Sequence, residues 1–173
     1  MKKIVVIALI CLSTLAHAQL TSKEEVTPEL VAKREAQKKE ITTHYLALKN
    51  NLLVSDSVSV VKNAVLLQNS LKNFRFKKLN LQQMNESMQE RKEIIALASQ
   101  IEATKNINKQ REIFKSLSAK FWDLAPKFKA ADTTLHLQVC PMTSASWLSD
   151  SKEIKNPYYP KNMLTCGEVK ASL

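Results

Sequence analysis

The side chains best suited to chemistry lie near the C-terminal end of this 173-residue chain, where each of two cysteines has a methionine close by. Met142 follows Cys140 by two positions, and Met163 precedes Cys166 by three. Thiolates and thioethers are soft ligands, and two cysteines with one or two methionines suit Cu(I), which accepts low coordination numbers. One prediction is therefore a soft-metal site formed by Cys140, Met142, Met163 and Cys166.

Two further side chains could complete such a site. Residues 135–140 alternate with period two, so His136, Gln138 and Cys140 would share one face of a strand. His136 is a possible nitrogen ligand, and Trp147 could lie over the metal and shield it from oxidation. Zinc fits less well than Cu(I), because only His136 offers a third ligand of the harder kind.

The same cysteines also support two readings without a metal. Two cysteines in an exported protein commonly form a disulfide. A Cys140–Cys166 bridge would close a loop of about 26 residues and stabilise the fold by about 3–4 kcal/mol in the chain-entropy model. The methionines would then fill gaps in the core. Buried free thiols are the other reading, and reduced and oxidised states could exchange, since only a reduced pair binds Cu(I).

The N-terminal residues have the features of a cleavable export signal. Lys2 and Lys3 precede an apolar stretch over residues 4–15 that is too short to span a bilayer. Residues 16–18 read Ala-His-Ala, with small residues at the two positions that a signal peptidase reads. We therefore expect a signal peptide over residues 1–18, a periplasmic location and no transmembrane segment after cleavage.

The composition favours helices and disfavours nucleic acid as a partner. The chain contains one glycine, whereas tight turns and sheet corners use glycine freely. Its 26 Lys and Arg outnumber its 16 Asp and Glu, which gives a net charge of +10, or +8 without Lys2 and Lys3. We interpret this charge first as solvated helix faces and second as weak attraction to anionic lipid. Nucleic acid is not an expected partner of an exported protein.

Apolar residues recur at helical spacing in four segments before residue 131. The stripes consist of Ile41, Tyr45, Leu48 and Leu52; of Val60, Ala64, Leu67, Leu71 and Phe74; of Met84, Met88, Ile95, Ala98 and Ile101; and of Phe114, Leu117, Phe121, Leu124 and Phe128. Thr27 before Pro28 and Asn80 before Gln83 are typical helix starts. Pro126 predicts a kink or a helix end.

These segments predict a mainly α protein, an antiparallel four-helix up-and-down bundle with a small C-terminal β-containing cap. The bundle would occupy residues 19–131 and the cap residues 132–173. Within the cap we expect strands near residues 135–140 and 163–169, joined by a turn-rich loop over residues 143–162.

Signatures of the common enzyme classes are absent from the sequence. Because Gly167 is the only glycine, the chain has no glycine-rich phosphate loop. It contains neither Gly-x-Ser-x-Gly nor His-Glu-x-x-His. Cys140 and His136 would lie about 13 Å apart on a strand, too far for a nucleophile and its base. We therefore predict a binding module and no enzyme.

Several stretches in order resemble one family. They are YLALKNNL at 45–52, QREIFKSLS at 110–118, CPM at 140–142, NPYY at 156–159 and MLTCGEV at 163–169. The chain is similar to an exported bacterial family of unknown function. Its members stand alone after a signal peptide or form the C-terminal module of periplasmic adaptor (membrane fusion) proteins of copper and silver efflux systems. The chain departs from the family pattern at Pro160, where a glycine is usual, and in a shorter segment between Met142 and Trp147.

The resemblance implies a heavy-metal role, with Cu(I) or Ag(I) as the ion and a heavy-metal efflux adaptor or pump as a possible partner. With the residues above, it predicts a periplasmic soft-metal binding or buffering module. The alternative is a structural or interaction module of the cell envelope, stapled by a Cys140–Cys166 disulfide and without metal.

Overall fold

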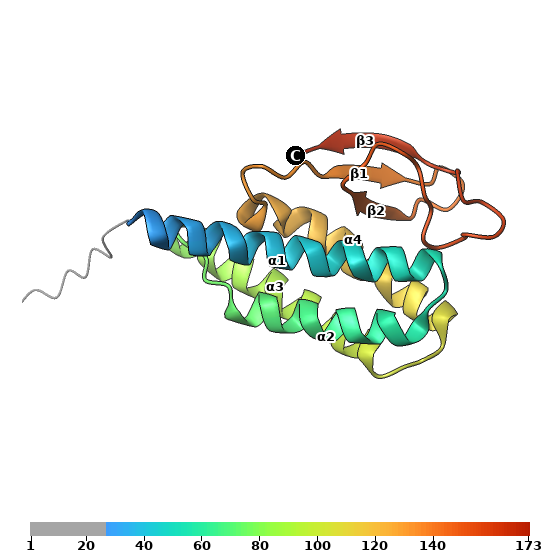
Figure 1. The fold of residues 1–173 in the computed structure, drawn as a ribbon, viewed down its shortest axis with the longest axis horizontal. Coiled ribbons are helices and arrows are strands. Elements are labelled where there is room, and N and C mark those ends of the chain that lie inside the picture. The colour runs from blue at the N-terminus through green and yellow to red at the C-terminus, as the bar shows by residue number, and fades with distance from the viewer. Residues whose placement is uncertain (1–26) are drawn as a thin grey trace, which may run out of the picture.

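A computed structural model describes residues 27–173, which form four helices and a three-stranded antiparallel sheet (Figure 1). The elements are α1 (Pro28–Leu53), α2 (Ser57–Asn73), α3 (Leu81–Glu102), α4 (Ile107–Phe128), β1 (His136–Val139), β2 (Ser146–Ser149) and β3 (Glu168–Ser172). The prediction of a mainly helical protein with a small β-containing C-terminal part is confirmed. The predicted signal peptide over residues 1–18 lies outside the described residues.

Each helix begins at a side chain that satisfies free backbone amides. Thr27 Oγ1 accepts a hydrogen bond from Leu30 N at 3.2 Å, with Pro28 in the first helical position. Asn80 and Gln83 form the predicted capping box, in which each side chain accepts a hydrogen bond from the other residue's backbone N–H, at 2.8 and 3.1 Å. Such caps replace hydrogen bonds that the first helical turn cannot make internally, and they fix where each helix starts.

The predicted stripes of α1, α2 and α4 are buried in one hydrophobic core, whereas the stripe of α3 was only partly right: Ala98 and Ile101 are buried, and Met84 and Ile95 pack against the core half-buried. Met88 is 37% exposed, whereas Ser87, Ile94, Ala98 and Ile101 are buried. These four positions follow one another at spacings of seven, four and three, so they share a face; Met88 lies about 100° away around the helix. The inclusion of Met88 in the core was therefore wrong.

The helices pack against one another in chain order, α1 on α2, α2 on α3 and α3 on α4, and α4 also contacts α1. Pro126, where a kink or helix end was predicted, lies in the last turn of α4, and the helix ends two residues later at Phe128. No helix among residues 27–173 is long and apolar enough to cross a membrane.

The sheet has the strand order β2-β1-β3 and lies along one side of the helices (Figure 1). β2 is the strand next to the helices and contacts α4 and α1, whereas β3 forms the outer edge and is largely exposed. β1 pairs with β2 from His136↔Ser149 to Val139↔Ser146, and with β3 from His136↔Ser172 to Val139↔Glu168. Both pairings are antiparallel, so chain segments at corresponding strand ends lie close together.

The strand predictions were partly wrong. β2 lies in the segment predicted to be a turn-rich loop. Its adjacent residues Trp147 and Leu148 are both buried, since it packs on helices as well as on β1, and this removes the alternation that marks a half-exposed strand. The second expected strand begins only at Glu168. The residues before it form turns, with Cys166 N donating to Met163 O at 3.1 Å.

Candidate thiol site in the C-terminal cap

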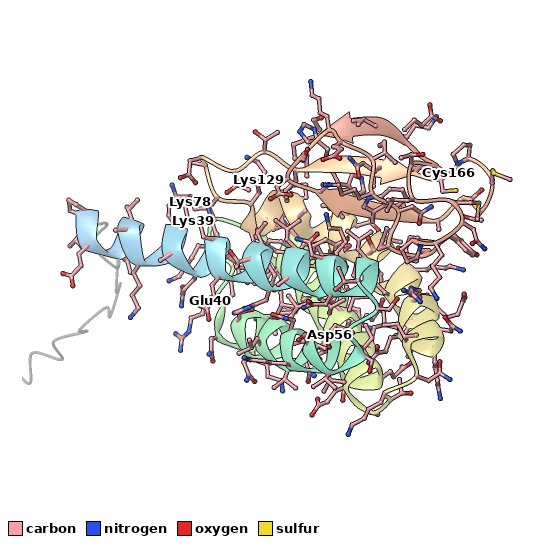
Figure 2. The ribbon with its side chains drawn as sticks, turned by 45° about the vertical axis from the view of Figure 1, so that its right-hand side comes forward. Lys39, Glu40, Asp56, Lys78, Lys129 and Cys166 are labelled. Carbon is pink, nitrogen blue, oxygen red and sulfur yellow. The ribbon has the colours of Figure 1, made fainter. Side chains whose placement is uncertain are left out.

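Cys140 and Cys166 meet where β1 and β3 pair. Cys140 directly follows β1, Cys166 lies two residues before β3, and Val139 is aligned with Glu168 in the register. The two Sγ atoms are 2.9 Å apart, and both cysteines are free thiols. Cys140 is fully buried, while Cys166 is half-buried at the end of the cap away from the labelled Lys39 and Lys78 (Figure 2).

A tight turn after β1 surrounds the Cys140 sulfur with donors. The Cys140 carbonyl accepts a hydrogen bond from Ser144 N at 2.8 Å, and Cys140 N donates to Ala145 O at 2.9 Å. Ser144 takes the left-handed conformation, with a φ of 55°, that lets the chain reverse direction here. The turn leaves the backbone amides of residues 142 and 143 beside the sulfur.

This surrounding stabilises a thiolate on Cys140. Burial raises the pKa of the Cys140 thiol, but hydrogen bonds from the Cys166 thiol, the Thr143 hydroxyl and the amides of Met142 and Thr143 outweigh it. The pKa of Cys140 therefore lies below its usual value. The same hydrogen bond to Cys140, together with burial, raises the pKa of Cys166. The pair thus ionises first at Cys140, while Cys166 keeps the shared proton.

Asn156 fixes the loop that carries Cys166, and it is completely buried. Its Nδ2 donates to Cys166 O at 3.2 Å, and its backbone N donates to Leu164 O at 2.8 Å. Its Oδ1 accepts hydrogen bonds from Tyr158 N at 2.9 Å and Tyr159 N at 3.3 Å. One side chain therefore joins the Asn-Pro-Tyr-Tyr turn to the backbone of the second cysteine.

Gly167 allows the backbone next to Cys166 to approach Trp147. A Cβ atom at Gly167 would lie 2.8 Å from Trp147 Cη2 and 2.9 Å from Ile154 Cγ2, closer than carbon atoms can pack. Trp147 is fully buried, and its Nε1 donates to Gln138 Oε1 at 2.6 Å. The only glycine of the chain is thus explained by a close contact, and Trp147 packs against the residue that directly follows Cys166. Its shielding role stays a prediction.

Arg111 connects the cap to the helices, and the sequence analysis missed it. This residue is 8% exposed; its Nε donates to Pro157 O at 3.0 Å, and its Nη2 to Leu52 O at 2.7 Å and Ser55 Oγ at 2.8 Å. The end of α1, α4 and the Asn156-Pro157 turn are therefore held by one guanidinium. The sequence did contain a signal for it: Arg111 stands three positions before Phe114, so it lies on the same face of α4 as the apolar stripe.

The other predicted ligands are placed differently from one another. Met142 is 76% exposed at the turn, and its backbone amide reaches both sulfurs. Met163 is half-buried, and its carbonyl accepts the hydrogen bond from Cys166 N. His136 lies at the opposite end of β1 from Cys140, with Nδ1 2.7 Å from Ser172 Oγ. The structure therefore brings the cysteines together, keeps both methionines beside them along the chain, and places His136 elsewhere.

A hard-ligand metal site is not formed in the described part of the chain. Among residues 27–173, no group of three or more His, Cys, Asp and Glu side chains could hold a metal ion. Two thiols, with a methionine close to each in the sequence, are a donor set for a soft ion of low coordination number. The residues present thus fit Cu(I) or Ag(I) better than zinc, which most often takes four N, S or O ligands.

The fold and site define a mainly helical protein with a small antiparallel sheet that carries a thiol pair. The model of the family described as "Protein of unknown function (DUF3347)" matches residues 41–133, more than half of the chain. The chain therefore belongs to this family. The matched segment runs from Ile41 in α1 to the segment before β1, so it contains the second half of α1 and all of α2, α3 and α4, and it ends before Cys140. The comparison with curated proteins gave no match. The comparison with solved structures gave none either.

Proposed function

We propose that this protein binds or buffers a soft monovalent ion, Cu(I) or Ag(I), through Cys140 and Cys166. The observation that carries the proposal is the 2.9 Å contact between two free thiols, one of which has a lowered pKa. Soft ions bind thiolate rather than thiol, so a pair that ionises readily at one member lowers the proton cost of binding.

The local geometry supports entry of an ion from the Cys166 side. Metal–sulfur bonds of about 2.3 Å, as zinc has, would place two sulfurs on opposite sides of an ion about 4.6 Å apart. The present 2.9 Å contact must then open by up to about 1.7 Å. Cys140 is buried behind β1, whereas Cys166 is half-buried in the turns before β3. Cys166 therefore makes the movement, and exposed Met142 supplies a third sulfur.

The setting of this function is proposed from the N-terminal sequence and from the resemblance described above. The protein is exported to the periplasm, has no enzymatic activity and serves a heavy-metal efflux adaptor or pump. The helices are proposed to form an antiparallel up-and-down bundle over residues 19–131, with the cap over residues 132–173. Contacts between helices that follow one another in the chain support this arrangement.

The test is a Cu(I) titration of the reduced protein against a competing chelator. We expect one ion per chain, and loss of this binding in a Cys140→Ser/Cys166→Ser double variant. Met142→Leu should weaken binding, whereas Met88→Leu, an exposed methionine on α3, serves as the matched control and should leave it unchanged. An unchanged affinity for Cu(I) in the double variant would contradict the proposal.

A second candidate function rests on the same sulfur contact. Cysteines beside aligned residues of neighbouring strands are placed for a disulfide, which would make the cap a stapled structural or interaction module of the envelope. Intact mass after thiol blocking, without reductant, separates the two on protein taken from copper-exposed cells. A fully oxidised pair under those conditions favours the disulfide; two blocked thiols or a retained ion favour the metal site.

A further inference from the structure

Away from the thiol pair, two adjoining hollows of about 290 and 300 Å³ are lined mainly by cations. The cations come from three segments: Lys33 and Arg34 on α1, Arg75, Lys77 and Lys78 between α2 and α3, and Lys127 on α4. Arg34, Arg75 and Lys77 line both hollows. We call this surface the basic hollow. Figure 2 shows Lys78 beside the N-terminal half of α1, far from Cys166.

Little negative charge balances these side chains. Among residues 27–173, the one acid that lines the hollow is Glu35, which accepts hydrogen bonds from Lys38 Nζ at 2.7 Å and Ala131 N at 2.9 Å. With Glu35 and Lys38 cancelling and Lys77 left out of the count, Lys33, Arg34, Arg75, Lys78 and Lys127 leave a local charge of +5. Arg34, Arg75 and Lys78 form no ion pair with any acid among residues 27–173. Such a concentration of one sign attracts anions to this surface.

The connection that carries three of the cations is anchored in the core. Phe74 and Phe76 are 4% and 6% exposed and form a T-shaped pair with ring centroids 5.4 Å apart. Arg91 Nη1 donates to Phe74 O at 2.8 Å and its guanidinium lies over the Phe76 ring. Arg75, between the two phenylalanines, is exposed. The phenyl rings of Phe74 and Phe76 therefore point inward, and the Arg75 side chain between them points outward from a backbone that the two rings hold in place.

We propose that the basic hollow is a docking surface for membranes that contain anionic phospholipids. Its cations on the connection and on α4 are exposed, so each keeps its water shell and gains little from a single small phosphate. A lipid surface presents many phosphates at once, and each nearby Lys or Arg contributes about fivefold in partition, the equivalent of about 1 kcal/mol. Val31, 46% exposed on the rim, adds apolar contact at the interface. The inference is independent of the thiol pair.

The experiment compares binding of the full chain to vesicles of phosphatidylcholine alone with binding to vesicles that also contain phosphatidylglycerol. The readout is the ratio of the two partition coefficients, which cancels any contribution that does not depend on lipid charge. The site variant is Arg34→Gln/Arg75→Gln/Lys78→Gln. The matched control, Lys62→Gln/Lys105→Gln/Lys161→Gln, removes the same charge from exposed positions outside the hollow. Circular dichroism verifies that both variants fold.

Each of the three removed charges should lower the ratio about fivefold, so we expect the site variant to lower it about a hundredfold in total. The control variant should lower the ratio less than about fivefold. Equal losses in both variants would show that only total charge matters and would overturn the proposal. A ratio near one for the unaltered chain would also overturn it. Saturable calorimetric binding of inorganic phosphate, lost in the site variant, would assign the hollow to free phosphate if that ratio is near one.

Discussion

Gly167→Ala tests whether the close packing beside Cys166 is as tight as the distances indicate. The new methyl group would lie 2.8 Å from Trp147 Cη2 and 2.9 Å from Ile154 Cγ2. Overpacking of this kind costs about 1–3 kcal/mol. Gly167 does not have a positive φ, so alanine can adopt its backbone conformation. Alanine also lowers the conformational entropy of the unfolded chain, which offsets about 0.4–1 kcal/mol of that loss in stability. The expected net loss is about 1–2 kcal/mol in the free energy of unfolding.

The assay is urea unfolding of four proteins: the unaltered chain, Gly167→Ala, Trp147→Phe and the double variant. Trp147→Phe is destabilising alone, because it leaves a gap and removes the hydrogen bond to Gln138. It also removes the atom that meets the new methyl group. Ile154 is half-buried and can shift, so on this background Gly167→Ala should cost close to nothing. The pair should show a coupling of about 1 kcal/mol or more.

A matched control and a clear refutation are available. Glu168→Ala alters the exposed neighbour of Gly167 and should change stability by less than about 0.5 kcal/mol. If Gly167→Ala lowered the free energy of unfolding equally with Trp or with Phe at position 147, the contact with Trp147 would not be the cause of the loss. A Gly167→Ala protein as stable as the unaltered chain would refute the reasoning outright.

Three further predictions concern the cap and its contact with α1. Asn156→Ala removes hydrogen bonds to Cys166 O and from the amides of Tyr158 and Tyr159, so urea unfolding should show a loss of about 2–4 kcal/mol; a change below about 0.5 kcal/mol would contradict the anchoring role. Lys49 is 3% exposed with Ser149 Oγ 3.4 Å from its Nζ, and burial lowers its pKa. The unfolded state then binds more protons, so stability should rise with pH from the folded pKa towards about 10.4, and Lys49→Met should abolish that rise; an unchanged slope would contradict it. Thiolate absorbance should show two steps, one below and one above the usual cysteine pKa, and Cys166→Ala should raise the lower one by removing its donor; a single step at the usual value would contradict the shared proton.

Much of the helical part could be predicted from the sequence because its signals are local. Caps such as Thr27 and Asn80 act within one turn, and three of the four apolar stripes face the core as predicted. The stripe of α3 holds at Ala98 and Ile101 but fails at its N-terminal half, because polar Ser87 lies inward while apolar Met88 is partly exposed. A pattern based on residue type alone cannot detect such an exchange, since neighbouring helices decide which face is covered.

The site could be predicted only as far as its residue types. The sequence indicated Cys140 and Cys166 because cysteine and methionine are rare and close together here. It did not predict β2, since a strand covered by helices does not alternate, and this strand sets the position of Trp147. Arg111 and Asn156 were missed as organising residues because the contacts that join segments go to backbone carbonyls: Arg111 donates to Pro157 O and Leu52 O far along the chain, and Asn156 Nδ2 donates to Cys166 O ten residues away. Such contacts leave no spacing pattern in the sequence.

X-ray absorption at the copper edge of the Cu(I)-loaded, reduced protein tests the central claim most directly. The account predicts an ion surrounded by sulfur alone, about two to three sulfur atoms, from Cys140, Cys166 and a methionine. This signal should disappear in the Cys140→Ser/Cys166→Ser variant, while circular dichroism shows that the variant keeps its helices. A first shell of nitrogen or oxygen, or a spectrum that survives loss of both cysteines, would contradict the account.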